Sequence, residues 1–232
     1  MKNFFLKSSL FYFFYKILKI LRNSKRSMHL GEFGEDIFVR RFFKNYKKGT
    51  YVDVGSYHPI KGSLTYNLYK KNWSGINIDL SKISVDLFKI SRSQDINLRA
   101  AITDYDGKTF YYENSPINQQ NSMIENSFAK KIEIDCFKLN TVLDKYQIKK
   151  IDYLNIDAEG NDFKVISTFD FERFKPALVT IEFNSYDFDM LLESDIHTLM
   201  KNNGYKLISK FGVTCFYVES KTSSNVHEIM RI

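Results

Sequence analysis

The sequence predicts an α/β fold with a mostly parallel sheet and helices on both of its faces. Short runs rich in β-branched and aromatic residues alternate with segments whose apolar residues recur at helical spacing. This alternation is typical of parallel strands joined by crossover helices. Two final apolar runs, separated by a turn near Gly212, predict a C-terminal antiparallel hairpin. We expect about seven strands in the sheet, the hairpin included.

Each predicted strand is a short apolar or β-branched run that ends near Gly, Asn or Asp. The runs "TYVDVG", "SGINIDL" and "IDYLNIDAEG" show this pattern most clearly. In chain order, the expected strands are 50–55, 74–80, 96–104, 106–114, 130–139, 151–160 and 176–184, followed by the hairpin 205–220.

Each predicted helix places its apolar residues on one side. In the first, Leu64, Leu68 and Tyr69 recur at helical spacing. The polar stretch 115–127 has no apolar period, and we expect a loop there that covers the site. In chain order, the expected helices are 63–73, 82–93, 140–148, 161–174 and 189–204.

Charge divides the chain into an arm, 1–30, and a domain, 31–232. The net charge is +7, but the first fifty residues hold twelve Lys and Arg against three acidic residues. The rest of the chain is therefore slightly acidic. Nucleic-acid binding by the domain is not expected, because it needs a basic face.

The arm contains a basic, aromatic helix pattern. Its longest unbroken apolar run, 10–15, is far shorter than the roughly 20 residues of a membrane span. Lys16 and Lys19 recur among aromatic and aliphatic residues, as in helices that lie in a membrane interface. Packing on its own domain or on another subunit is the main alternative, and a true span is a third. We expect a cytoplasmic protein with peripheral contact at the inner membrane face.

The two cysteines, Cys136 and Cys215, lie far apart and form no CxxC pattern. We expect buried free thiols rather than a disulfide. No Cys and His spacing indicates zinc.

Polar residues, mostly acidic, end nearly every predicted strand. They are expected at one edge of the sheet, where α/β folds bind ligands. Turn preferences of Asp account for part of this pattern. The residues are Asp53, Asp79, Thr103 with Asp104, Asp157 and Asn184.

The turn after the first strand indicates which ligand binds there. A dinucleotide site needs GxGxxG, whereas only Gly55 is present, followed by Ser56 and later Pro59. Asp79 is well placed for ribose hydroxyls, a feature of both nicotinamide and S-adenosylmethionine sites. Asp53 would repel a diphosphate but attract a sulfonium and an ammonium group. The turn therefore favours S-adenosylmethionine.

Four segments together resemble the FkbM family of S-adenosylmethionine-dependent methyltransferases. They are "GTYVDVGSYHP", "SLTYNLYKKNWSGINID", "NLRAAITD" and "IDYLNIDAEGNDFKVI", of which the last is the most specific. The resemblance covers about 31–220 and implies a Rossmann-like class I methyltransferase fold. It also implies O-methylation, since family members act on hydroxyl groups of sugars or natural products.

The expected cofactor residues surround the first two strand ends. Gly55 would permit close backbone approach, Asp53 would face the methionine part, and Asp79 would bind both ribose hydroxyls. Ser63 and Thr65 would bind the methionine carboxylate or cap a helix. The full set is Asp53, Gly55, Ser56, Ser63, Thr65, Asp79 and Asp104.

The candidate catalytic residues are Asp157, Glu159 and His58. On an extended backbone, Asp157 and Glu159 would share one face and could accept the proton of an alcohol. His58 is a further base, or a structural residue before Pro59. Glu182 is expected at the same edge, where it could bind acceptor hydroxyls. A divalent cation held by the carboxylates is a less favoured option.

These patterns predict transfer of a methyl group to a hydroxyl of a saccharide or related natural product. The acceptor would belong to surface-glycan biosynthesis and could be lipid-linked, in keeping with the arm. A non-catalytic binding module or scaffold of the same fold is one alternative. A nicotinamide-dependent sugar oxidoreductase is the other.

Overall fold

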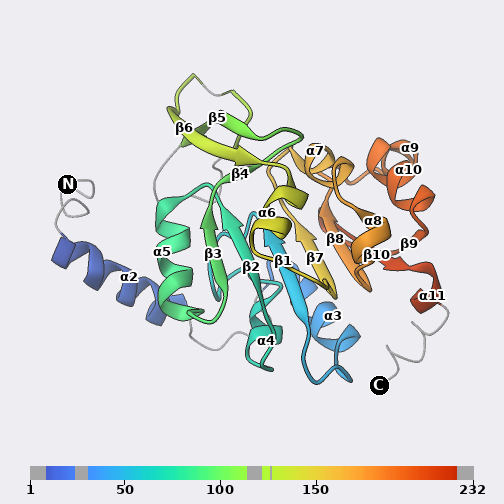
Figure 1. The fold of residues 1–232 in the computed structure, drawn as a ribbon, viewed down its shortest axis with the longest axis horizontal. Coiled ribbons are helices and arrows are strands. Elements are labelled where there is room, and N and C mark those ends of the chain that lie inside the picture. Colours follow the sequence, from blue (N-terminus) through green and yellow to red (C-terminus); the bar gives the residue numbers. More distant parts are fainter. Residues whose placement is uncertain (1–8, 24–30, 114–121, 126, 224–232) are drawn as a thin grey trace.

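The computed structural model describes residues 9–23, 31–113, 122–125 and 127–223 of the chain. Its centre is a seven-stranded sheet with the order β3-β2-β1-β7-β8-β10-β9 (Figure 1). The first five strands in this order are parallel, and β10 is antiparallel to both β8 and β9. The prediction of a large, mostly parallel sheet is thus confirmed. The strands are β1 (Thr50–Val54), β2 (Ser74–Asp79), β3 (Ile96–Arg99), β7 (Tyr153–Ile156), β8 (Leu178–Glu182), β9 (Tyr205–Phe211) and β10 (Thr214–Glu219).

A second, three-stranded sheet stands at the top of Figure 1. It pairs β4 (Ala101–Ile102) and β5 (Gly107–Glu113) with β6 (Lys130–Phe137). The sequence predicted one strand through 96–104, but the structure divides this segment between the two sheets. The break follows from packing, because Ala101 joins the small core around Cys136 and leaves the central sheet.

Helices cover both faces of the central sheet. One core is formed by Val52 and Val54 of β1 with side chains of α6, α7, α8 and α10. The other is formed on the opposite face by Tyr51 with α3 and α4. The helices are α2 (Ser9–Asn23), α3 (Glu35–Phe42), α4 (Tyr66–Tyr69), α5 (Lys82–Ser91), α6 (Leu139–Lys145), α7 (Asp162–Ser167), α8 (Phe171–Phe174), α9 (Phe188–Glu193), α10 (Asp195–Asn202) and α11 (Ser220–Ser223).

Three helices are shorter than the sequence predicted. The expected helix 161–174 divides into α7 and α8, because the Asp170 side chain accepts a hydrogen bond from Arg173 N and starts a new helix. Ser194 divides the expected helix 189–204 in the same way, by capping α10 at His197 N. The first helix ends early, and Asn72 beyond it adopts a left-handed conformation.

Helix α2 packs beside α5 on the left of Figure 1. The Tyr12 hydroxyl donates to Asp86 Oδ2 of α5 at 2.7 Å. The described part of the arm therefore contacts its own domain, as one of the alternatives proposed. No helix among the described residues combines the length and apolar character that a bilayer crossing requires.

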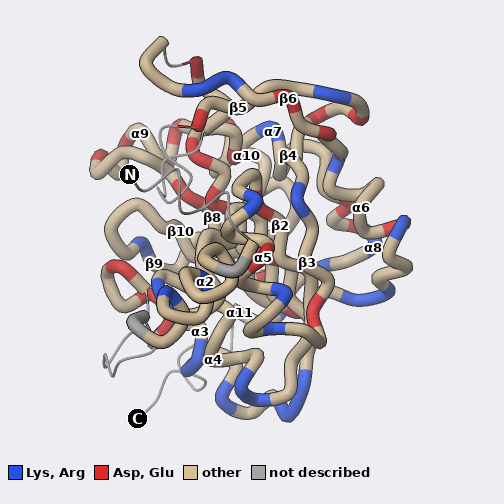
Figure 2. The backbone as a smooth tube through the Cα atoms, turned by 90° about the vertical axis from the view of Figure 1, so that its left-hand side faces the viewer, with Lys and Arg blue, Asp and Glu red and all other residues tan. Residues whose placement is uncertain are grey.

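Charge is unevenly distributed over the edges of the domain. In Figure 2, acidic residues gather around α9 and the upper end of β8, and basic residues gather near α4 at the opposite edge. Cys136 and Cys215 are free and buried, in β6 and β10, as the sequence predicted.

Candidate functional site

A cavity of about 310 Å³ opens at the carboxyl edge of the central sheet. It lies between the ends of β1 and β7, where the strand order reverses. This switch point is where open α/β sheets bind ligands. Eight of the predicted site residues line it, namely Asp53, Gly55, Ser56, His58, Ser63, Asp79, Asp157 and Glu159.

Asp79 ends β2 and is held by two backbone groups. Tyr57 N donates to its Oδ2 at 2.8 Å, and Ser81 N donates to its Oδ1 at 2.7 Å. Burial raises the pKa of Asp79 to about 6, and these hydrogen bonds oppose that increase. The carboxylate is fixed against the wall of the cavity, with acceptor lone pairs available for hydroxyl groups.

Asp53 belongs to a buried row of polar side chains beneath the cavity. Asn155 Nδ2 donates to Asp53 Oδ1 at 2.9 Å, and Thr180 Oγ1 donates to Asn155 Oδ1 at 2.6 Å. The parallel register aligns these residues on β1, β7 and β8. Burial raises the pKa of Asp53, and its hydrogen bonds lower it. The row makes a rigid floor for the site.

Gly55 permits close packing between two strand ends. Its φ is +77°, and a Cβ atom added there would lie 1.7 Å from the carbonyl oxygen of Asp157. Only glycine fits both this conformation and this contact. Ser56 follows it, with its N–H bonded to Ile78 O at 3.1 Å. Gly55 therefore allows the carboxyl end of β1 to pack against the segment that carries Asp157.

Ser63 and Thr65 are held by a buried arginine. Arg92 Nη1 donates to Thr65 Oγ1 at 2.7 Å, and Arg92 Nη2 donates to Ser63 Oγ at 2.6 Å. Thr65 donates in turn to Asp53 Oδ2 at 2.7 Å. Thr65 is fully buried and does not line the cavity. Thr65 therefore lies below the cavity floor, and its predicted contact with the cofactor stays a prediction.

His58 serves the loop after β1. Its Nδ1 accepts hydrogen bonds from Ile60 N and Lys61 N, both at 3.0 Å. Burial and nearby cations lower the pKa of His58 to about 3. Such an imidazole stays neutral and is a weak base. The geometry therefore supports a structural role for His58, the alternative to its predicted role as a base.

Asp104 lies outside the cavity. The chain leaves the central sheet after Arg99, and Asp104 is exposed beyond β4. Thr103 beside it donates its hydroxyl to Tyr105 O at 2.7 Å. The expectation that Asp104 ends a third strand over the site is corrected, because that strand belongs partly to the small sheet.

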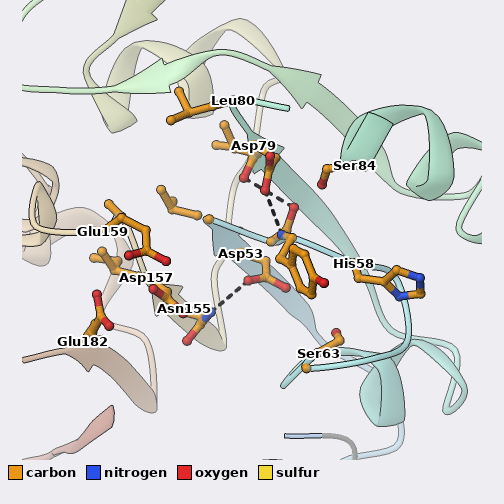
Figure 3. A pocket seen from close by; sticks show the side chains of 18 of the residues that line it. Asp53, His58, Ser63, Asp79, Leu80, Ser84, Asn155, Asp157, Glu159 and Glu182 are labelled. Carbon is orange, nitrogen blue, oxygen red and sulfur yellow. Dashed lines mark hydrogen bonds between the residues drawn. The ribbon is translucent and has the colours of Figure 1, made fainter. Parts of the chain in front are cut away.

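Three carboxyl groups meet on one side of the cavity: Asp157, Glu159 and Glu182 (Figure 3). Ile156 pairs with Ile181 across β7 and β8, so the next residues on the two strands, Asp157 and Glu182, are neighbours. Figure 3 shows them on the opposite side of Asp53 from His58.

These groups hold protons more tightly than free carboxyls. Burial, followed by the charge of Glu182, raises the pKa of Asp157 well above its ordinary value. Asp157 is solvent-exposed where it lines the cavity, so screening by water moderates this increase. Burial and the charges of Asp162 and Glu159 raise the pKa of Glu182 to about 7. Because Asp157 and Glu182 are neighbours, the charge of Glu182 makes ionisation of Asp157 less favourable.

Glu159 reaches this group through a turn. The sequence placed Asp157 and Glu159 on an extended backbone, but Glu159 has a φ of +50° and Gly160 one of +91°. Ser122 Oγ donates to Glu159 O at 2.9 Å, so residues 122–125 lie against this turn. Most of the predicted loop 115–127 lies outside the described residues, namely 115–121 and 126.

Metal chemistry has no visible support in the described segments. No group of three or more His, Cys, Asp and Glu side chains there has an arrangement suited to holding an ion.

Sequence reasoning missed several residues that build the site. Asn77 and Asn155 are polar residues inside otherwise apolar strands, a signal that indicates a buried polar network. Arg92 and Lys19 had no such signal, because their neighbours in sequence are ordinary helix residues. Only the fold brings these two to the site.

Fold and site together define a class: α/β proteins that bind a small ligand at the switch point of a parallel sheet. The polar row supports that site from below, and a carboxyl cluster flanks it.

The methyltransferase FkbM domain profile matches residues 53–207. The chain therefore belongs to the FkbM methyltransferase family, which confirms the resemblance seen in its sequence. Searches of curated proteins and of solved structures each found no match.

Membership makes the protein a methyltransferase and implies S-adenosylmethionine as the methyl donor. The site fits this cofactor in two respects. Asp79 presents a fixed carboxylate, a group that accepts hydrogen bonds from hydroxyls, and the many carboxyl groups suit a positively charged sulfonium.

Proposed function

We propose that this protein transfers the methyl group of S-adenosylmethionine to a hydroxyl of a saccharide or related natural product. The supporting observation is the carboxyl pair Asp157 and Glu182 inside the cofactor cavity. A hydroxyl is a poor nucleophile until a base takes its proton. Burial raises the pKa of both carboxyl groups, to about 7 for Glu182, and a raised pKa suits a group that must take up a proton near neutral pH.

The cofactor supplies an electrophilic methyl group on a positively charged sulfur. Asp79 would bind its ribose hydroxyls, and the backbone at Gly55 and Ser56 would lie beside it. Asp53 would act through the electrostatic field of the cavity floor, since Thr65 and Asn155 already occupy both of its carboxylate oxygens.

The acceptor hydroxyl would lie beside Asp157 and Glu182, with Glu159 within the same group. As the new bond forms, the ionised pair takes up the hydroxyl proton. The pair can hold this proton because protonation relieves the repulsion between its two neighbouring carboxylates. Holding both reactants in one enclosed cavity supplies much of the remaining rate enhancement.

The proposed setting is surface-glycan biosynthesis at the inner face of a membrane. The basic arm would attach the enzyme peripherally and bring it to a lipid-linked acceptor. The exposed apolar side chains of α2 support this placement.

Two substitutions separate cofactor binding from chemistry. Asp79→Asn should weaken S-adenosylhomocysteine binding at least about 10-fold, because it removes the charged acceptor of the ribose hydroxyls. Asp157→Asn should keep that affinity within about 3-fold and reduce methyl transfer at least about 100-fold. Affinity is measured by titration calorimetry, and transfer by labelled methyl incorporation into a panel of free mono- and oligosaccharides.

Each contrary result points to a named alternative. If the wild-type protein binds neither S-adenosylmethionine nor S-adenosylhomocysteine, the fold serves as a scaffold. Tight NAD binding in place of these ligands would support an oxidoreductase. Unchanged transfer in Asp157→Asn would remove the base assignment and leave the methyltransferase class intact.

A further inference from the structure

The cavity has a strongly one-sided charge. Among its described lining residues, Lys19 of α2 is the sole Lys or Arg. The acidic lining residues are Glu32, Glu35, Asp53, Asp79, Asp157, Glu159 and Glu182. This imbalance suits the sulfonium and ammonium groups of S-adenosylmethionine but opposes its carboxylate, which needs a cation or several donors when buried.

Two donors near the cavity, Arg92 and Ser63, are already engaged. Arg92 is fully buried below the floor, does not line the cavity, and binds Pro59 O, Ser63 and Thr65. Ser63 Oγ also accepts from Thr65 N at 3.3 Å and from Tyr66 N at 3.2 Å. Ser63, predicted from the sequence as a carboxylate ligand, is therefore occupied in stabilising the start of α4.

Lys19 is held against the cavity by the packing of its helix. Tyr12 donates to Asp86 of α5, and Lys82 forms an ion pair with the same carboxylate at 2.6 Å. Lys19 Nζ lies 6.0 Å from the centre of the Tyr15 ring. Burial lowers the pKa of Lys19, and its charge contributes to lowering the pKa of His58, so its ammonium group lies near the loop after β1.

We propose that Lys19 binds the carboxylate of the methionine part of S-adenosylmethionine, which makes the N-terminal helix α2 a wall of the cofactor site. This inference rests on the proposed function, because it requires that cofactor. It extends the site beyond the family domain, whose match begins at residue 53. The arm then has a role in binding as well as in location.

The test compares two ligands that differ only in the carboxylate: S-adenosylmethionine and its decarboxylated analogue. Lys19→Met should weaken binding of S-adenosylmethionine by about 10- to 100-fold, the usual scale for a lost charge-assisted contact. Binding of the decarboxylated analogue should stay within about 3-fold, because it lacks the group that Lys19 contacts. Lys19→Arg should restore most of the affinity for S-adenosylmethionine.

Lys61→Met is the matched control. Lys61 is exposed in the loop after β1 and does not line the cavity. The affinities of this variant for S-adenosylmethionine and for its decarboxylated analogue should therefore stay within about 3-fold of the wild type. Thermal unfolding of each variant shows whether α2 and the domain remain folded, and Lys19→Gln provides a second neutral variant.

Three outcomes would overturn the inference. Lys19→Met could leave the affinity for S-adenosylmethionine unchanged, or weaken both ligands equally, which would indicate a general effect on the cavity. If Lys61→Met reproduced the ligand-specific loss, long-range charge would account for it. A wild-type protein that binds neither ligand would remove the proposed function as well, so the two failures are distinguishable.

Discussion

Arg92 links the floor of the cavity to the loop that borders it. It is fully buried at the end of α5, and its Nε donates to Pro59 O at 2.9 Å. Burial raises the pKa of the nearby carboxyl groups of Asp53 and Asp95, and the charge of Arg92 opposes that increase. A buried cation with these partners is costly to disrupt, because removing it leaves buried carboxylates without compensation.

We predict that Arg92→Met lowers the free energy of unfolding by about 3–5 kcal/mol. The methionine fills similar space but leaves Ser63, Thr65 and the Pro59 carbonyl without their donor. Urea unfolding followed by circular dichroism measures the loss. Lys89→Met, an exposed change on the same helix, should cost less than about 0.5 kcal/mol. A loss below about 1 kcal/mol for Arg92→Met would contradict this account.

Helix α2 has two different sides. Tyr12 and Lys19 face the domain, whereas Phe14 and Leu18 are 54% and 65% exposed, with Phe11 and Leu21 at similar levels. These four positions recur at intervals of three and four residues and form one stripe. The strong positive charge of the first fifty residues supports the proposed attachment of this stripe to an anionic bilayer.

We predict that the full chain co-sediments with vesicles containing phosphatidylglycerol and binds neutral phosphatidylcholine vesicles much more weakly. Leu18→Glu should reduce the bound fraction at least about 5-fold, because it places a charge in the apolar stripe. Phe163→Glu, at an exposed aromatic on α7, serves as the control and should bind like the wild type. Equal binding by Leu18→Glu and the wild type would exclude the stripe as the contact surface.

At the scale of the whole molecule, one cavity concentrates acidic groups at the carboxyl edge of the central sheet. The pKa values of Asp79, Asp157 and Glu182 are all raised, with burial as the largest cause. The folded state is therefore more stable when each of these carboxyl groups is protonated than when it is ionised. Their ionisation destabilises the fold as the pH rises through the folded-state values, about 6 for Asp79 and about 7 for Glu182.

We predict that Glu182→Gln stabilises the protein at pH 8 by about 1–2 kcal/mol, a value reduced for solvent screening inside the cavity. The gain should disappear near pH 4, where Glu182 is protonated in both the folded and unfolded states. Thermal unfolding at the two pH values measures it. Glu172→Gln, an exposed change on α8, should show no such pH dependence. Equal gains at both pH values would contradict the electrostatic cause.

Predictions from local sequence were most reliable where a single segment decides the outcome. The runs around Val52, Ile76 and Leu154 form buried parallel strands because apolar β-rich segments of that length need cover on both faces. Helix ends were less reliable, since the caps at Asp170 and Ser194 compete with continuous apolar periodicity and prevail.

The sequence by itself determined the alternation of strands and helices, the family, and the acidic strand ends at Asp53, Asp79 and Asp157. These features depend on residues close together in the chain. Only the tertiary structure decided that β4 joins a second sheet, that Arg92 supports the cavity floor, and that Lys19 borders the cofactor cavity. Such contacts join segments far apart in sequence, and packing and charge compensation in three dimensions select them.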